Sequence, residues 1–82
     1  MSASELGAGR HRSVQDAARW LEVNPSLPEP LAVVSRMFET TARLVLEAVE
    51  VDDPELTRAL VLLTQAKDAA VRAKIAEGRT RE

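Results

Sequence analysis

The sequence ELTRALVLLTQAKDAAVRAKIA, from Glu55 to Ala76, decides the fold, because its apolar residues form two stripes along one long helix. A helix at a protein surface usually shows one apolar stripe, so two stripes indicate two packing contacts. We expect one stripe to pack within the chain and the other against a neighbouring subunit. The first stripe is rich in alanine and consists of Leu56, Ala59, Leu63, Ala66, Ala70 and Ala73. The second consists of Leu60, Thr64, Lys67, Val71 and Ile75.

The two stripes differ in character. Alanine lets helix axes approach closely at little cost in side-chain entropy, so the closest helix packing is expected along the first stripe. The second stripe is bulkier and is interrupted by Lys67. A lysine in an apolar stripe can extend its ammonium to water, pair with an acid across an interface, or face a bound anion. Any ligand site is therefore sought on the second stripe.

Length and composition favour self-association. A core built from 82 residues rarely contributes more than about 3–5 kcal/mol without additional support. The chain has no cysteine and one histidine, His11, which excludes disulfides and thiolate metal sites and leaves no zinc site. We expect no cofactor or metal, and a homo-oligomer that gains burial by association.

Charge and hydropathy narrow the list of partners. The net charge is −2, which argues against general nucleic-acid binding. A DNA-reading second helix would carry Glu29 and Glu39 toward phosphates with only Arg36 to offset them. No apolar run approaches the roughly 18 residues of a membrane span, and the start MSASELGAG lacks the apolar centre of a signal peptide. We expect a cytoplasmic protein that binds neither DNA nor membranes.

Helix start and stop signals divide the chain. Residues 1–12 are small and polar and are predicted to be a disordered tail. Ser13 is the predicted cap of a helix over 14–23, and Asn24 before Pro25 ends that helix. The connector NPSLPEP contains Ser26 and Glu29 at the spacing of a capping box, which predicts a second helix over 28–51.

The second helix is amphipathic. Its expected packing face is flanked by Val33, Met37 and Leu44, and the face itself consists of Leu31, Val34, Phe38, Ala42, Val45 and Val49. The turn after it is well specified, because Asp53 can cap a helix and Pro54 suits its first position. The third helix is predicted over 54–77, with Gly78 closing it in the left-handed conformation and 79–82 as a tail.

These elements predict an all-α fold with a single helical domain over 13–78. A short N-terminal helix precedes a long antiparallel helical hairpin, and the whole oligomerises. The sequence leaves open whether the first helix packs on its own hairpin or on another chain.

Residues that carry catalytic chemistry are sparse. The serines have no histidine outside the predicted tail to activate them. Asp52, Asp53 and Glu55 lack the ligand spacing and glycine of a calcium loop, so capping and solubility explain them. Trp20 and Phe38 are interpreted as core side chains. We expect no enzymatic activity.

The last helix resembles one known family. An acidic turn is followed by the alanine-rich helix, with Leu56, Ala59, Leu63 and an alanine-lysine step at Ala66 and Lys67. This segment resembles the helical hairpin of phage anti-CBASS cyclic-nucleotide sponges, and the resemblance covers about Ala32 to Ala76. It implies a non-catalytic helical oligomer that sequesters cyclic di- or trinucleotide signals of bacterial antiviral defence.

Four polar or basic groups on or beside the packed helix are our candidate ligand residues: Thr64, Lys67, Arg72 and Lys74. In a symmetric oligomer such groups repeat around an axis and can build a phosphate pocket that one chain lacks. The competing hypothesis is a helical interaction module that binds a host or virion protein through the Ala-rich face or the Trp20 helix, without a small-molecule ligand.

Overall fold

The computed structural model describes residues 6–80 of the chain, with side chains as far as Gly78. Within this range all regular secondary structure is helical and there is no strand, which confirms the predicted all-α class. Its elements are α1 (Arg12–Ala18), the 3₁₀ turn η1 (Arg19–Leu21), α2 (Glu29–Ala48) and α3 (Pro54–Thr80). Residues 1–5 and 81–82, the outer parts of the two predicted tails, lie outside the described residues.

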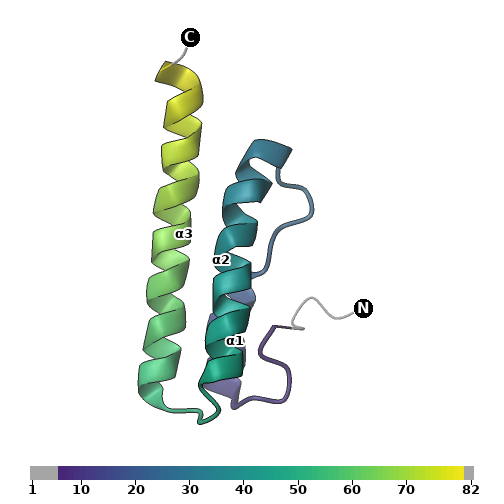
Figure 1. Ribbon diagram of the computed structural model, residues 1–82, viewed down its shortest axis with the longest axis vertical. Coiled ribbons are helices and arrows are strands. Elements are labelled where there is room, and N and C mark those ends of the chain that lie inside the picture. Colours follow the sequence, from purple (N-terminus) through teal and green to yellow (C-terminus); the bar gives the residue numbers. More distant parts are fainter. Residues whose placement is uncertain (1–5, 81–82) are drawn as a thin grey trace.

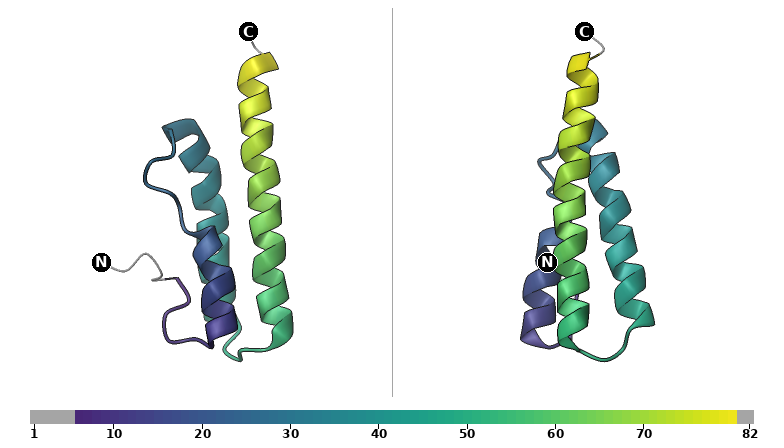
Figure 2. Two further views of the ribbon diagram at one scale, coloured as in Figure 1. Left: turned by 180° about the vertical axis from the view of Figure 1, so that it is seen from behind. Right: turned by 90° about the vertical axis from the view of Figure 1, so that its left-hand side faces the viewer.

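The two long helices lie side by side and run in opposite directions, joined by residues 49–53 (Figure 1). The shorter α1 lies against one side of this pair, at the end near the 49–53 connection (Figure 2). At 1.5 Å per residue, the 20 residues of α2 span about 30 Å and the 27 residues of α3 about 40 Å. The C-terminal end of α3 therefore extends beyond the start of α2.

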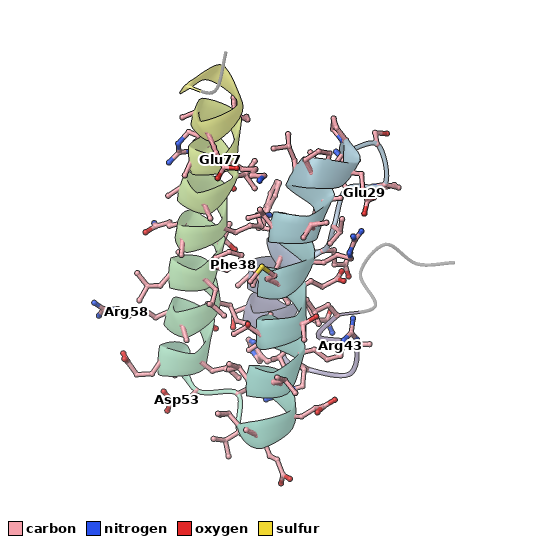
Figure 3. The ribbon with its side chains drawn as sticks, turned by 45° about the horizontal axis from the view of Figure 1, so that its top comes forward. Glu29, Phe38, Arg43, Asp53, Arg58 and Glu77 are labelled. Carbon is pink, nitrogen blue, oxygen red and sulfur yellow. The ribbon has the colours of Figure 1, made fainter. Side chains whose placement is uncertain are left out.

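The core lies where all three helices overlap. It is made of Leu6, Val14, Ala17, Ala18, Leu21, Ala42, Leu56 and Leu60. Phe38 lies between α2 and α3 and packs against this cluster as expected (Figure 3). Trp20 was predicted to be a core side chain, but it is 63% exposed, with the Arg19 guanidinium 5.6 Å from its ring centroid. The prediction was wrong because the buried side of this short segment is formed by Ala17, Ala18 and Leu21, which leaves Trp20 at the surface.

The predicted tail was wrong for residues 6–11, which pack against the helices. Leu6 is 4% exposed and belongs to the core, and its amide donates to Glu22 Oε2 at 2.9 Å. Gly7 and Gly9 have φ of 84° and 82°, a region that favours glycine. A Cβ on Gly7 would lie 3.2 Å from the Ala18 Cβ, so glycine also allows the segment to approach α1 closely.

The start of α1 differs from the sequence prediction. Its N-cap is His11, whose ring Nδ1 accepts from the Ser13 amide at 3.1 Å, so Ser13 is inside the helix rather than capping it. The imidazole can cap here because residues 10 and 11 are held in place by contacts with Asp52. Regular helix ends at Ala18 and the 3₁₀ turn at Leu21, two residues before the predicted end.

The start of α2 also uses different chemistry from the prediction. Pro28 is the N-cap and provides no side-chain bond. The Ser26 amide donates to Asn24 Oδ1 at 2.9 Å, and the Glu29 carboxylate accepts from Arg36 at 2.7 Å. The predicted Ser26–Glu29 capping box is therefore wrong, because each member has a closer partner. The helix ends at Ala48, three residues before the predicted end.

The third helix begins as predicted and ends later. The Asp53 carboxylate accepts from the Glu55 amide at 2.8 Å, which confirms the cap before Pro54. Gly78 does not close the helix, which continues to Thr80. A left-handed ending is favoured where the chain folds back onto its own helix. Apart from its own helix backbone and chain neighbours, nothing lies within 4 Å of the place where a Gly78 Cβ would be, so no packed surface there favours the reversal.

Candidate functional site

The four candidate ligand residues do not form one cluster. Thr64 Oγ1 donates to the carbonyl of Leu60 in its own helix at 3.0 Å. Lys74 Nζ pairs with Glu77 Oε1 at 2.8 Å, in the part of α3 beyond the start of α2. Only Lys67 and Arg72 line a common pocket.

Lys67 has a structural partner that the sequence could not reveal. Its ammonium donates a hydrogen bond to the backbone carbonyl of Trp20, near the end of η1. A cation at the C-terminal end of a helical turn is favourable, because unsatisfied carbonyls carry partial negative charge there. This contact explains a lysine in an apolar stripe without a bound anion.

The pocket that contains Lys67 and Arg72 lies between the 22–28 connector, α2 and α3. Its volume is about 300 Å³, and it is lined by Glu22, Asn24, Leu27, Ser35, Lys67, Asp68, Val71 and Arg72. Ser35 is 3% exposed and lies at its α2 wall. Two carboxylates oppose the two cations, so the lining is balanced in charge rather than selective for anions. The volume is at the lower end of the range for ligand pockets.

A second polar cluster joins the N-terminal segment to the connection between the long helices. Arg10 Nε contacts Asp52 Oδ1 at 2.6 Å, while Nη1 and Nη2 donate to the carbonyls of Leu46 and Val49 at 2.9 and 2.8 Å. The guanidinium thus caps the C-terminal end of α2. No sequence pattern signals this contact, because Arg10 lies in a stretch without periodicity and its partners are 36 to 42 residues away.

Asp52 is held as a carboxylate by this cluster. Its second oxygen accepts from the His11 amide at 2.7 Å. The backbone hydrogen bond from His11, followed by the hydrogen bond from Arg10, lowers the pKa of Asp52 from its ordinary value of 3.8. Desolvation opposes this shift only in part. The cluster is therefore a structural ion pair that fixes residues 10 and 11 to the 49–53 connection.

His11 and Ser13 lie closer together than the sequence interpretation assumed. His11 Nδ1 is 3.0 Å from Ser13 Oγ, and Thr57 Oγ1 lies 3.4 Å from the same hydroxyl. However, Nδ1 also accepts from the Ser13 amide, and Asp52 bonds the His11 backbone rather than its ring. The ring is positioned as a helix cap, and a carboxylate does not orient it as a general base.

The two α3 stripes are used differently from the expectation. The second stripe turns inward, with Leu60 buried and Thr64, Lys67 and Val71 half-buried. In the Ala-rich stripe, Leu56 is buried and Ala59, Leu63 and Ala70 are half-buried, while Ala66 and Ala73 are exposed. The Ala-rich stripe is therefore not the more closely packed one within the chain. The inward direction of α3 lies between the two stripes. The exposed alanines Ala66 and Ala73 lie on the outer surface of α3, beside α2.

The side of the α2–α3 pair away from α1 carries an exposed apolar surface, which we call the open face. It consists of Val33, Met37, Thr41 and Leu44 of α2 and Leu62, Ala66, Ala69 and Ala73 of α3. Met37, Leu44 and Leu62 are 63%, 59% and 51% exposed. The Thr41 hydroxyl donates to the carbonyl of Met37 at 2.8 Å, so its methyl group adds to the apolar surface.

Helical periodicity places these residues opposite α1. On α3, Thr57 and Lys67 contact the α1–η1 segment, and the Leu62 to Ala73 stripe lies about half a turn around the helix from Thr57. On α2, Glu39 accepts from the Val23 amide, and Met37 and Leu44 lie on the opposite side. Figure 1 looks onto the open face, and the left view of Figure 2 shows α1 on the other side.

Comparisons with family models, with curated proteins and with solved structures find no match for this chain. Over residues 6–80, no group of three or more His, Asp or Glu side chains is placed to hold a metal ion. Nor does any helix of the described chain combine the length and apolarity needed to cross a membrane.

Proposed function

We propose that the protein is a non-catalytic helical interaction module whose open face binds amphipathic helices of a protein partner. The observation that carries this proposal is the apolar surface of the open face. Its large side chains Met37, Leu44 and Leu62 are each more than half exposed, and apolar side chains gathered on one face in this way mark interaction sites. Such a surface costs solubility unless a partner covers it.

The chemistry of the open face suits a helical partner. Its apolar residues recur at spacings of three and four on two adjacent antiparallel helices, so they form two parallel ridges. The alanines of α3 allow a partner helix to approach closely, and Met37 adapts its shape to the partner surface. Amphipathic helices with apolar residues at i, i+3, i+4 and i+7 are complementary to such ridges.

A photocrosslinking experiment tests this proposal in the cells that make the protein. A photoreactive amino acid in place of Met37 should give a covalent adduct with another polypeptide, whether a foreign protein or a second copy. The same amino acid in place of Arg12, whose side chain is 88% exposed on the α1 side, is the matched control and should give none. Equal adduct yields at the two positions, or none at either, would contradict the proposal.

A second candidate function is binding of an anionic cyclic di- or trinucleotide, as implied by the resemblance to the phage sponges. One observation favours it: Lys67 and Arg72 line the same pocket. The charge-balancing Glu22 and Asp68 weigh against an anion there, so we rank it second. Its test is thermal unfolding with a panel of cyclic dinucleotides and trinucleotides near 100 micromolar or so. A ligand bound to the native state alone must raise the unfolding temperature, and no increase with any member would refute this function.

A further inference from the structure

We propose that the helices received by the open face are α2 and α3 of a second copy of this chain. The two copies are related by a two-fold axis parallel to the helices, and together they form an antiparallel four-helix bundle. This inference rests on the proposed function and identifies the partner. Rotation about such an axis keeps every residue at its level along the bundle and places α2 of one copy over α3 of the other.

Side-chain size is complementary in this arrangement. The α2 half of the open face carries large side chains, and the α3 half carries alanines together with Leu62. Ser35 and Lys67 line one pocket and so lie at a similar level. Because the helices run in opposite directions, Val33 is then level with Ala69, and Met37 lies within one residue of the level of Ala66. The two-fold axis therefore sets Met37 and Val33 over alanines of the second copy.

An axis across the helices would give a poorer fit. That arrangement places α2 over α2 and α3 over α3. Met37 and Leu44 would meet large side chains, while Ala66 and Ala73 would meet alanines, so one side would be overfilled and the other left with voids. Close packing requires large side chains opposite small ones, which favours the axis parallel to the helices.

The charged edges of the open face are also complementary. Glu29 and Glu47 are 18 residues apart, five full helical turns, so they share one edge of α2. Arg58 points outward from the edge of α3 away from α2 (Figure 3), and Arg72 lies two heptads further along. Under the two-fold rotation this edge of α2 in one copy meets the arginine edge of the other, and Glu29 already has a partner within its own chain in Arg36, 2.7 Å away. The predicted contact between copies is therefore Glu47 with Arg58, which lie within one turn of the same level.

The dimer would cover exposed apolar side chains of both copies. Met37, Leu44 and Leu62 are each more than half exposed in one chain, and the two-fold axis places each of them in the interface twice. Half-buried side chains at the seam between α2 and α3 (Val34, Phe38 and Leu63) would become covered as well. In such a dimer the apolar core would continue from one copy into the other. The dimer would therefore bury apolar surface that a chain this short cannot bury alone.

Charge reversal tests the predicted edge contacts. Glu47→Arg and Arg58→Glu should each weaken the dimer about tenfold, since each disrupts two symmetry-related pairs. The double variant should restore the wild-type dissociation constant, because the reversed charges meet again between copies. Arg12→Glu makes the same charge change as Arg58→Glu on the α1 side, where the Arg12 side chain is 88% exposed, and it should alter dissociation less than twofold. Sedimentation velocity at a series of concentrations measures all four variants. Failure of the double variant to recover would overturn the edge contacts.

The direction of the two-fold axis can be tested by pairing introduced cysteines, because the chain has no native cysteine that could form other disulfides. Met37→Cys and Ala66→Cys, purified separately and mixed under mild oxidation, should form a disulfide-linked heterodimer. Neither variant alone should crosslink to itself. Self-crosslinking of Met37→Cys would overturn the proposed axis, and a wild-type chain that remains monomeric at 200 micromolar or so would overturn the second copy as partner. If the chain is monomeric but the photoreactive residue at position 37 gives an adduct with a foreign protein, the proposed interaction module remains supported. If the chain is monomeric and no adduct forms, both the interaction module and the second copy as partner are refuted.

Discussion

Removing the Arg10 side chain should strongly destabilise the fold although Arg10 lies in a stretch without regular secondary structure. The Arg10→Ala substitution deletes two hydrogen bonds from a cation to the carbonyls of Leu46 and Val49, both at 2.8–2.9 Å. The Arg10 side chain is 17% exposed, so water replaces these bonds poorly. At about 1–1.5 kcal/mol for each bond in this setting, the loss is about 2–3 kcal/mol. The ion pair with Asp52 is not counted in this figure, because the Asp52 side chain is 26% exposed and water partly screens the pair.

That loss is large for a chain of this size. One kcal/mol shifts the unfolding temperature of a 60–100-residue domain by about 4–8 °C, so Arg10→Ala should lower it by roughly 10–20 °C. Circular dichroism at 222 nm as a function of temperature measures the shift. Arg12→Ala is the matched control, because Arg12 is 88% exposed and 4.0 Å from Asp16, and it should change the midpoint by less than about 3 °C.

Two results would refute this reasoning. If Arg10→Ala and Arg12→Ala unfold at the same temperature, the N-terminal segment does not hold the end of α2. If Arg10→Lys is as stable as wild type, the planar fork of the guanidinium is not what matters, because a lysine can pair with Asp52 but cannot reach both carbonyls at once.

Three further variants probe the same packing. The pKa of Asp52 is lowered in the folded state, so its stabilising effect is present above the unfolded value of 3.8 and is lost as the pH falls through the folded pKa. Between pH 7 and about pH 2.5 the unfolding temperature should therefore fall less for Asp52→Asn than for wild type. Parallel curves of unfolding temperature against pH would count against the pairing. Gly7→Ala should lower the free energy of unfolding in urea more than Gly9→Ala does. Both glycines have positive φ, but only a Cβ at Gly7 would press on Ala18, at 3.2 Å. Equal losses would show that the close approach does not contribute to stability. Lys67→Met should cost about 1 kcal/mol through the unpaired Trp20 carbonyl, read from the same urea curves, and an unchanged midpoint would contradict that contact.

The parts of the fold that could be predicted from the sequence have local causes. Asp53 and Pro54 specify the start of α3 through bonds and dihedral angles within two residues of each other, and the structure confirms the cap. The inward faces of α1 and α2 follow from helical periodicity, and Val14, Leu21 and Ala42 are buried as that periodicity predicts.

The parts that could not be predicted depend on contacts distant in sequence. Leu6 is buried because residues 10 and 11 bind Asp52, more than 40 positions away, and no local pattern signals that. Lys67 was identified correctly as unusual, but its partner is a backbone carbonyl, which has no sequence signature. The two stripes of α3 were recognised, yet the direction in which α1 approaches decides which one turns inward.

The mass of the protein in solution tests the account most directly. Light scattering over a range of concentrations should give a wild-type mass that rises toward twice 9.0 kDa, and a mass of 9.0 kDa for the Met37→Glu/Leu62→Glu variant. Because both side chains are exposed, that variant should keep the wild-type helical content. A wild-type mass of 9.0 kDa at every concentration, or a variant that still dimerises, would contradict the proposal that the open face joins two copies of this chain.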